Sequence, residues 1–361
     1  MLAFYLAVVK RRVIVDIGKV GKAIAYLRKR AGYTQKELAD RIGISDKAVS
    51  KWERGQGLPE IGYLRKLSIL LDTDSDSLLA GDVAHHDSGW YGIIVLDENG
   101  YDIGAGTVIY DKPLINFLLS YFLLVGIKNI MIICTDADRK YINRSLGDGS
   151  DYGIKIVCYA KTLKGAIEDE RITASNIMMV FGRCLLYGVD QTRFFQKAMI
   201  NKNHFTMLVL PKKIDQYSRI MMDADKKIVN DDSTGLHTQY DFSDIPIIFF
   251  PAKLLYELIG SSSISSFVDK YVSQNEVYVE MLDRGFVEIE VDSWDNVQEA
   301  SVFFKIVQDK CGMNVYCIEE VAWRRGMISL NQLKKLGKRY SGTSYGDYVL
   351  SLYDRFKERL E

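Results

Sequence analysis

The sequence predicts a small all-α domain followed by an open-sheet α/β domain with a helical C-terminal segment. The chain has 361 residues, more than one hydrophobic core usually holds, so at least two domains are expected. Apolar residues recur at helical spacing over residues 17–54. From residue 92 onward, short apolar runs alternate with helical patterns, which is typical of a mostly parallel sheet with helices on both faces.

Residues 1–16 are predicted to be an N-terminal extension of unassigned purpose. Nine apolar residues come first and three basic residues follow, which reverses the order of a signal peptide. Nine residues are also too few to span a bilayer, as is the interrupted apolar run over residues 114–127. The five cysteines show neither metal-ligand nor CxxC spacing and indicate reduced thiols. We therefore expect a cytoplasmic protein with no membrane partner and no metal site.

Three helices and a sharp turn are predicted near the N-terminus. The first helix ends at Gly32. Thr34 caps the second helix, and Glu37 three residues later completes a capping box. Gly43 then makes the turn, and Ser45 caps a third helix that runs to about residue 54. Two short helices joined by a glycine-containing turn are the smallest unit that can place a helix in the major groove of DNA.

Residues 17–81 closely resemble the Cro/repressor-like (XRE) helix-turn-helix family. The resemblance is carried by a segment that begins at Thr34 and reads TQKELADRIGISDKAVSKWERGQGLPEIGYLRKLSILLDTDSDSLLAG. It implies a five-helix domain that binds double-stranded DNA as a transcriptional regulator. The excess of 12 Lys and Arg over 8 Asp and Glu in residues 17–81 suits contact with phosphates.

The resemblance also implies particular DNA contacts. Gln35, at the start of the second helix, would hydrogen-bond the DNA backbone. Val49 and Trp52 would turn inward as core residues, whereas Glu53 and Arg54 are predicted to be structural or solvated rather than base-reading. The residues that would project from the third helix toward bases or phosphates are Ser45, Asp46, Lys47, Ser50 and Lys51.

Residues 82–89 are polar, show no periodicity and are predicted to be a linker, in which His85 and His86 are solvated. Beyond the linker, residues 90–355 are predicted to form the second domain. We expect strands at 92–97, 129–134, 154–159 and 177–181, helices at 113–124 and 139–146, mixed strands as far as Pro251, and a mainly helical end over 296–353.

Three segments of the second domain resemble the glucose-1-phosphate thymidylyltransferase family of sugar nucleotidyltransferases. They are YDKPLINFLLSYFLLVGIKNIMIICT, SLGDGSDYGIKIVCYA, and VEMLDRGFVEIEVDSWDNVQEASVFFKIVQDKCGMNVYCIEEVAWRRGMIS followed by YGDYVLSLY. The resemblance covers residues 90–355 and implies an open α/β sheet of the Rossmann-like nucleotidyltransferase type. In that family a sugar phosphate attacks the α-phosphorus of a nucleoside triphosphate. Backbone amides and cations surround the triphosphate, and carboxylates hold magnesium.

Several positions of that chemistry are altered in this chain. Gly104, Gly106 and Thr107 remain after the first strand, without the arginine and lysine of the family's glycine-rich loop, and a simple turn explains them equally well. Arg183 stands where the resemblance places one magnesium-binding aspartate, and Glu290 where it places the second. Losing one electrostatic donor removes about 3 kcal/mol of transition-state stabilisation. We therefore predict no catalytic residue and no cofactor.

Our first hypothesis is a transcriptional regulator whose second domain is a pseudoenzyme. That domain would sense a nucleotide or nucleotide sugar, assemble homodimers or homotetramers, or do both, with surface-polysaccharide genes as candidate targets. Arg183 would then anchor a phosphate without metal, unless it is an ordinary surface or ion-paired residue. The candidate ligand-binding residues are Gly104, Gly106, Thr107, Arg183 and Glu290.

Two alternatives stay open. In the first, the chain is a divergent thymidylyltransferase with a DNA-binding appendage. It would convert dTTP and glucose 1-phosphate to dTDP-glucose and pyrophosphate, with magnesium bound through Glu290. In the second, the α/β domain is only an oligomerisation scaffold with an empty pocket, so that no metabolite would alter operator binding.

Overall fold

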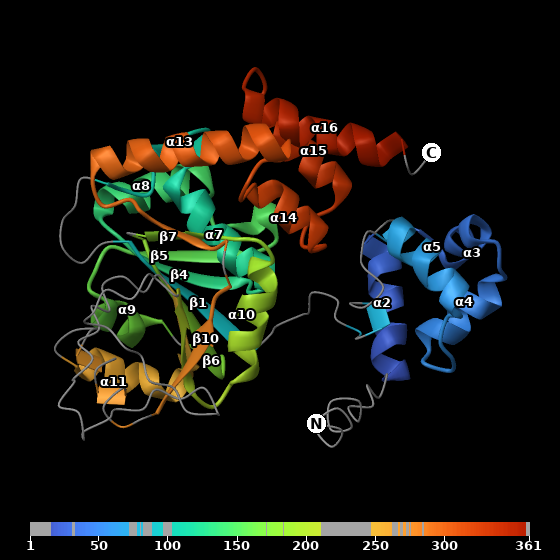
Figure 1. The fold of residues 1–361 in the computed structure, drawn as a ribbon, viewed down its shortest axis with the longest axis horizontal. Helices are drawn as coiled ribbons and strands as arrows, with labels where there is room; N and C mark the ends of the chain where they lie inside the picture. Colours follow the sequence, from blue (N-terminus) through green and yellow to red (C-terminus); the bar gives the residue numbers. More distant parts are fainter. Residues whose placement is uncertain are drawn as a thin grey trace, which may run out of the picture. The chain divides into compact units, whose positions relative to one another are not determined.

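The computed structural model describes residues 16–30, 33–71, 78–79, 81, 89–96, 103–170, 172–182, 184–210, 247–261, 266–267, 270–271, 274, 276–283 and 285–358. They form two compact units whose main boundary falls between residues 85 and 86 (Figure 1). The predicted extension and linker lie outside the described residues apart from Asp16 and Gly89, and so does Arg183. Within the described ranges, no helix combines the length and the apolar composition needed to cross a membrane.

Local capping sets the helices of the first unit. The Thr34 hydroxyl accepts the Glu37 N–H at 3.1 Å, and the Glu37 carboxylate accepts the Thr34 N–H at 2.6 Å, which completes the predicted capping box. Gly43 ends that helix in the left-handed region at φ 80°, where glycine carries no steric cost. The helices are α2 (Ile17–Arg30), α3 (Gln35–Ile42), α4 (Asp46–Glu53) and α5 (Ile61–Leu71), and residues 78–79 are also helical.

The core of the first unit forms where α2 crosses α4. Val49 and Trp52 of α4 are buried, as predicted. The two helices approach closely at Gly21, where a Cβ atom would lie 2.2 Å from the Trp52 carbonyl oxygen. Glycine is therefore required at this crossing, because any side chain would separate the helix that carries Ser45–Lys51 from its support.

The second unit is organised around a seven-stranded sheet with the order β10-β8-β9-β6-β1-β4-β5. All neighbours pair in parallel except β9, which is antiparallel to both β6 and β8. The sheet strands are β1 (Trp90–Val95), β4 (Asn129–Ile133), β5 (Lys155–Tyr159), β6 (Asn176–Phe181), β8 (Phe205–Val209), β9 (Ile247–Pro251) and β10 (Val277–Met281).

Helices cover both faces of this sheet, as the alternation of strands and helices predicted (Figure 1). On one face, the Tyr121 and Phe195 rings lie 5.8 Å apart, and Phe195 in turn packs on Phe249 of the sheet. On the other face, the core includes Ile93 and Phe250. The first face carries α7 (Leu114–Val125), α8 (Asp136–Ser145) and α10 (Gln191–Ile200), and the second carries α9 (Leu163–Asp169) and α11 (Leu255–Gly260).

The C-terminal segment is helical, as predicted, and forms a further layer over α7. The Phe304 and Phe117 rings, from the long helix α13 and from α7, lie 4.7 Å apart. A small hairpin lies beside the same helix, with the Tyr110 N–H donating to the Ser301 hydroxyl at 3.0 Å. These elements are β2 (Val108–Ile109), β3 (Lys112–Pro113), α13 (Trp294–Cys311), α14 (Ile318–Arg324), α15 (Leu330–Arg339) and α16 (Ser344–Glu358).

One carboxyl group is buried between α14 and α16. Glu319 has no exposed surface, and among the described residues its Oε1 atom has no hydrogen-bond partner. Its Oε2 atom accepts a hydrogen bond from the Tyr345 hydroxyl and another from the Cys317 thiol at 3.5 Å. Burial raises the pKa of Glu319 and outweighs these hydrogen bonds.

Replacing Glu319 by glutamine is therefore expected to remove a pH-dependent loss of stability. Because the pKa of Glu319 is raised by folding, the protonated side chain favours the folded state below its ordinary pKa of about 4.3, and this contribution is lost as the pH rises toward the folded-state pKa. In thermal melting from pH 5 to pH 8, the melting temperature of Glu319→Gln should rise relative to that of the wild type as the pH rises. Glu168 is exposed, so the control variant Glu168→Gln should show the same dependence of melting temperature on pH as the wild type. If Glu319→Gln also shows that dependence, the burial argument is contradicted.

Candidate functional site

The outward face of α4 gathers the residues predicted to contact DNA. Ser45, Asp46, Lys47 and Lys51 are exposed and Ser50 is half-buried, whereas Val49 and Trp52 on the opposite face are buried. Ser45 also caps the helix, since its hydroxyl accepts the Ala48 N–H at 3.3 Å. A short helix that is buried on one face and presents two lysines and two hydroxyls on the other has the form of a recognition helix.

Gln35 lies in a network that joins three helices. Its side-chain amide donates to Glu53 Oε2 at 2.6 Å, so in this structure Gln35 is held by Glu53 at the edge of the unit. Glu53 also forms a bidentate ion pair with Arg28, with Nε–Oε1 at 2.5 Å and Nη2–Oε2 at 3.0 Å. Arg28 donates further to the Tyr33 carbonyl at 2.6 Å. Glu53 is therefore structural, and Gln35 is positioned by it.

The sequence reasoning placed Arg28 on the apolar stripe of α2 through its stem and did not foresee this network. The Arg28 and Glu53 side chains are only 9% and 7% exposed, so both charges are largely removed from water. The sequence did contain one indication of this ion pair, because Arg28 in α2 and Glu53 in α4 each stand at a position of the helix that is otherwise apolar. The partner of each residue, 25 residues away, could not be deduced from either helix alone.

In the second unit, the order in which successive strands are added to the sheet reverses at β1. From β1 the sheet grows through β4 to β5, and the chain then returns to β6 on the other side of β1. At their carboxyl ends, the Gly182 N–H donates to the Val95 carbonyl at 2.9 Å, and a Cβ on Gly182 would lie 3.2 Å from the Leu96 Cα. Ligands of open α/β sheets bind at such a switch point, so this edge is the candidate ligand-binding region.

Gly104 and Thr107 lie near this edge in a closed turn. The Gly104 N–H donates to the Thr107 hydroxyl at 3.1 Å, and the Thr107 N–H donates back to the Gly104 carbonyl at 3.0 Å. The Ala105 N–H donates to Asp138 Oδ1 at 2.7 Å, in the first turn of α8. These three N–H groups have protein partners and cannot at the same time bind a phosphate in this conformation.

Replacing Gly104 by alanine is expected to destabilise the second unit by about 2 kcal/mol. A Cβ atom at Gly104 would lie 2.4 Å from Asp138 Oδ1, so the turn must shift and the buried Ala105 N–H loses its partner. Denaturant unfolding measures the effect. Gly260→Ala is the matched control, because no atom lies within 4 Å of its added Cβ. Equal stability of the two variants would show that the turn is not held by Asp138.

Gly106 and Glu290 complete the described part of the candidate ligand set. Gly106 packs on Tyr141, whose ring carbons would lie 3.0 Å from an added Cβ. Glu290 is exposed on β11 (Val287–Glu290), which pairs antiparallel with β7 (Cys184–Tyr187) and places Glu290 opposite Cys184. The chain register therefore brings Glu290 next to the residue that follows Arg183.

Cys184, the residue opposite Glu290, is buried. Burial raises the pKa of the Cys184 thiol, and the nearby Glu288 carboxylate raises it further. Throughout the described part of the chain, no three His, Cys, Asp or Glu side chains gather as a metal site requires.

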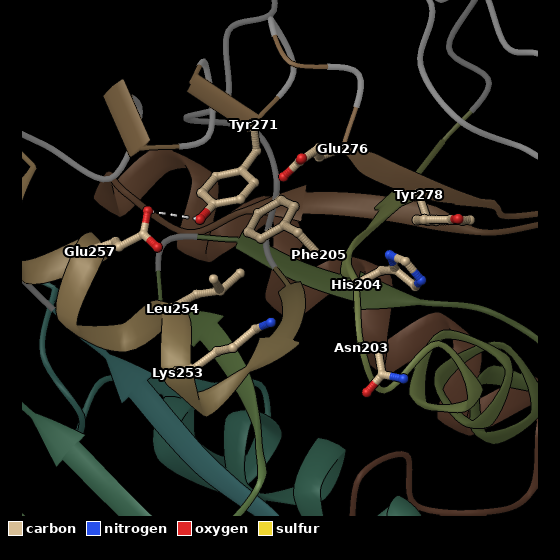
Figure 2. Close-up of a pocket in the computed structure, with 9 residues that line it drawn as sticks. All are labelled: Asn203, His204, Phe205, Lys253, Leu254, Glu257, Tyr271, Glu276 and Tyr278. Carbon is tan, nitrogen blue, oxygen red and sulfur yellow. Dashed lines mark hydrogen bonds between the residues drawn. The ribbon is translucent and has the colours of Figure 1, made fainter.

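A separate pocket of about 520 Å³ lies at the opposite edge of the sheet, at the amino ends of β8 and β10 (Figure 2). Its wall includes Tyr271, whose hydroxyl donates to Glu257 Oε2 at 3.0 Å, and the His204 and Tyr278 rings, whose centroids lie 4.4 Å apart. Hydrogen bonds from Lys270 and Tyr271 hold the pKa of Glu257 below its usual range, and burial together with Glu257 raises the pKa of Tyr271 to about 12. Its residues come from distant segments, so the sequence did not indicate it.

The two units match two different families. Residues 24–78 match the family model described as Helix-turn-helix, and residues 107–228 match the model described as Nucleotidyl transferase. Glucose-1-phosphate thymidylyltransferases from Neisseria meningitidis serogroup A and Mycolicibacterium smegmatis are 27% identical over 258 residues and 26% identical over 264 residues. Either alignment covers 68% of this chain and 90% of the relative.

A solved structure from Bacillus anthracis, assigned as a glucose-1-phosphate thymidylyltransferase and crystallised with sucrose, is 12% identical with a TM-score of 0.46. It covers 59% of this chain and 94% of its own. Both resemblances predicted from the sequence are confirmed by the family models and the sequence relatives. The chain is a helix-turn-helix DNA-binding domain fused to a nucleotidyltransferase domain related to the glucose-1-phosphate thymidylyltransferases.

Proposed function

We propose that this protein is a sequence-specific transcriptional regulator whose second unit senses a nucleotide or nucleotide sugar, joins two or more copies, or does both. The observation that carries the proposal is the outward face of α4. Lys47 and Lys51 project there from a helix that Val49 and Trp52 anchor in the core. Such a helix enters the major groove, where lysine contacts guanine or phosphate.

The changes in the second unit support a loss of nucleotidyl transfer. Three N–H groups of the turn at Gly104–Thr107 already have acceptors, two within the turn and one at Asp138, so the turn offers few donors to a triphosphate. An arginine at position 183 would repel a magnesium ion, because both are positively charged, but a guanidinium can bind a phosphate group without metal. The proposed effector is a nucleotide or nucleotide sugar, and the candidate ligand residues stay those that the sequence indicated, Gly104, Gly106, Thr107, Arg183 and Glu290.

The effector class follows from the relatives. Glucose-1-phosphate thymidylyltransferases produce a nucleotide sugar, so dTDP-sugars are the first probes to use. We also propose that the protein acts in the cytoplasm, on genes for surface polysaccharides, because the enzymes that such genes encode consume nucleotide sugars.

An electrophoretic shift assay on the protein's own promoter region tests the proposal, with dTDP-glucose and dTDP-rhamnose added separately. Specific binding that one ligand changes supports a metabolite-responsive regulator. Specific binding that neither changes supports regulation with a scaffold domain and counts against dTDP-sugar sensing. Binding that non-specific competitor DNA removes entirely argues against regulation at this site.

One alternative function retains an observation in its favour. The relative from Neisseria meningitidis serogroup A is matched over 90% of its length, and Glu290 pairs in register with Cys184, the residue that follows position 183 in the sequence. Release of pyrophosphate from dTTP and glucose 1-phosphate would establish a divergent thymidylyltransferase, provided that Glu290→Ala abolishes it. The regulator proposal expects no pyrophosphate above a protein-free control.

A further inference from the structure

Two cysteines lie close together at the carboxyl ends of the neighbouring strands β4 and β5. In the parallel register of these strands, Ile132 pairs with Cys158 and Ile133 pairs with Tyr159. The Cys134 N–H donates to the Tyr159 carbonyl at 3.0 Å, so the pairing continues one residue beyond the end of β4. Cys134 therefore lies diagonally across from Cys158 on the next strand.

Both thiols lie on the same face of the sheet. Successive side chains of a strand alternate between the two faces, and Met131, Ile133 and Tyr159 belong to the core on the face that carries α9. Cys134 and Cys158 therefore belong to the opposite face, which carries α8. Their side chains are hydrogen-bonded to each other, so the two sulfur atoms face one another.

The two thiols differ in exposure and in acidity. Cys134 is buried, whereas Cys158 is half-buried and can be reached from solvent. The hydrogen bond from Cys134 lowers the pKa of Cys158 and raises the pKa of Cys134, and the Arg139 guanidinium of α8 lowers the pKa of Cys158 further. By contrast, burial raises the pKa of Cys184 and of Cys317. The reactive thiolate is therefore expected at Cys158, with a second thiol directly beside it.

We propose that Cys158 and Cys134 form a modification site at which hydrogen peroxide produces a reversible disulfide bond. The Cys158 thiolate attacks one oxygen of the peroxide, the O–O bond breaks, and the leaving hydroxide takes up a proton from solvent as water. Cys158 is then a sulfenic acid. The Cys134 sulfur attacks it, the S–O bond breaks, and the Cys134 proton leaves with the departing hydroxide as water. Together the two thiols lose two electrons and two protons, and one peroxide becomes two waters.

The position of Cys134 allows the two sulfur atoms to approach to the bonding distance of about 2.05 Å. Cys134 follows the last residue of β4 and precedes Thr135, the N-cap of α8, so it is held by the sheet on one side only. In the first turn of the same helix, Asp138 accepts the Ala105 N–H at 2.7 Å. The pair therefore lies at the edge of the candidate ligand-binding region. The proposal goes beyond the proposed function and does not depend on DNA binding.

Peptide mapping of the full chain after treatment with an equimolar amount of hydrogen peroxide tests the proposal. The remaining thiols are alkylated, and a tryptic digest is analysed by mass spectrometry without reductant. In the wild type, the main oxidised product should be the Cys134 peptide joined to the Cys158 peptide, lighter by two hydrogen atoms than the two reduced peptides together. Dithiothreitol should restore both thiols. The matched control is Cys311→Ser, which removes an exposed cysteine outside the pair and should leave the yield of the joined peptide unchanged.

Two serine variants separate the roles of the two thiols. In Cys134→Ser, the sulfenic acid at Cys158 has no thiol partner, so dimedone should label Cys158 at least about 10-fold more than in the wild type. Cys158→Ser should leave Cys134 unlabelled, because that thiol is buried. Oxidation of the wild type at Cys311 without the joined peptide would overturn the proposal. Equal dimedone labelling of Cys158 in the wild type and in Cys134→Ser would also overturn it, because Cys134 would then not react with the sulfenic acid.

Discussion

Replacing Glu53 by alanine is expected to lower the free energy of unfolding of the first unit by about 3 kcal/mol. The change leaves Arg28 with its charge largely buried and unpaired, because the guanidinium bonds Glu53 through two nitrogens and is 9% exposed. It also releases the Gln35 amide. Hydrogen exchange of the α2–α4 amides in the full chain measures the effect locally, and exchange should accelerate more than 100-fold.

The control for this variant is Glu37→Ala, in the same unit. Glu37 is exposed and its carboxylate accepts the Thr34 N–H in the capping box, so its loss should cost about 1 kcal/mol or less. Glu53→Gln should fall between the two, because it keeps a neutral acceptor for Arg28. If Glu53→Ala and Glu37→Ala accelerate exchange equally, the buried ion pair does not hold the unit together.

Replacing Lys47 and Lys51 together by alanine is expected to weaken DNA binding by roughly 30-fold or more. Each lysine is exposed on α4, and each contact with a phosphate or a guanine is worth about 1 kcal/mol or more. The slope of log affinity against log salt concentration should also fall by about 1 for each phosphate that the missing lysines would have neutralised. Fluorescence anisotropy with labelled duplex DNA at several salt concentrations measures both quantities.

The matched control replaces Lys22 and Lys29, two exposed lysines of α2, by alanine. It removes the same net charge from the same unit, but from α2 rather than from the recognition helix. An equal loss of affinity in the two double variants would mean that binding depends on overall charge rather than on α4. Unchanged affinity in the α4 variant would remove α4 from the interface.

Much of the fold could be predicted because the rules that set it are local. Thr34 and Glu37 lie three residues apart, and Gly43 adopts a backbone conformation that few other residues tolerate, so the sequence alone marks the start and end of α3. Buried parallel strands such as β4 are continuous apolar runs and stand out for the same reason.

The parts that could not be predicted depend on contacts between distant segments. Nothing near Arg28 identifies Glu53 as its partner, and nothing near Gly104 shows that Asp138 will accept the N–H of the next residue. The exposure of Val302 and Ile306 on α13 was missed for a related reason. Val302 and Ile306 fit the apolar pattern of a helix, and only the fold shows that Val297 and Phe304 take the buried side instead.

The most direct test of the central claim is selection of binding sites from a random double-stranded DNA library with the purified full chain. A regulator that reads sequence through α4 should enrich one motif, arranged as two half-sites about one helical turn apart or a multiple of it. The variant with Lys47→Ala and Lys51→Ala should lose that enrichment. A library that shows no enriched motif after selection with the wild type would contradict the claim that this protein reads DNA sequence.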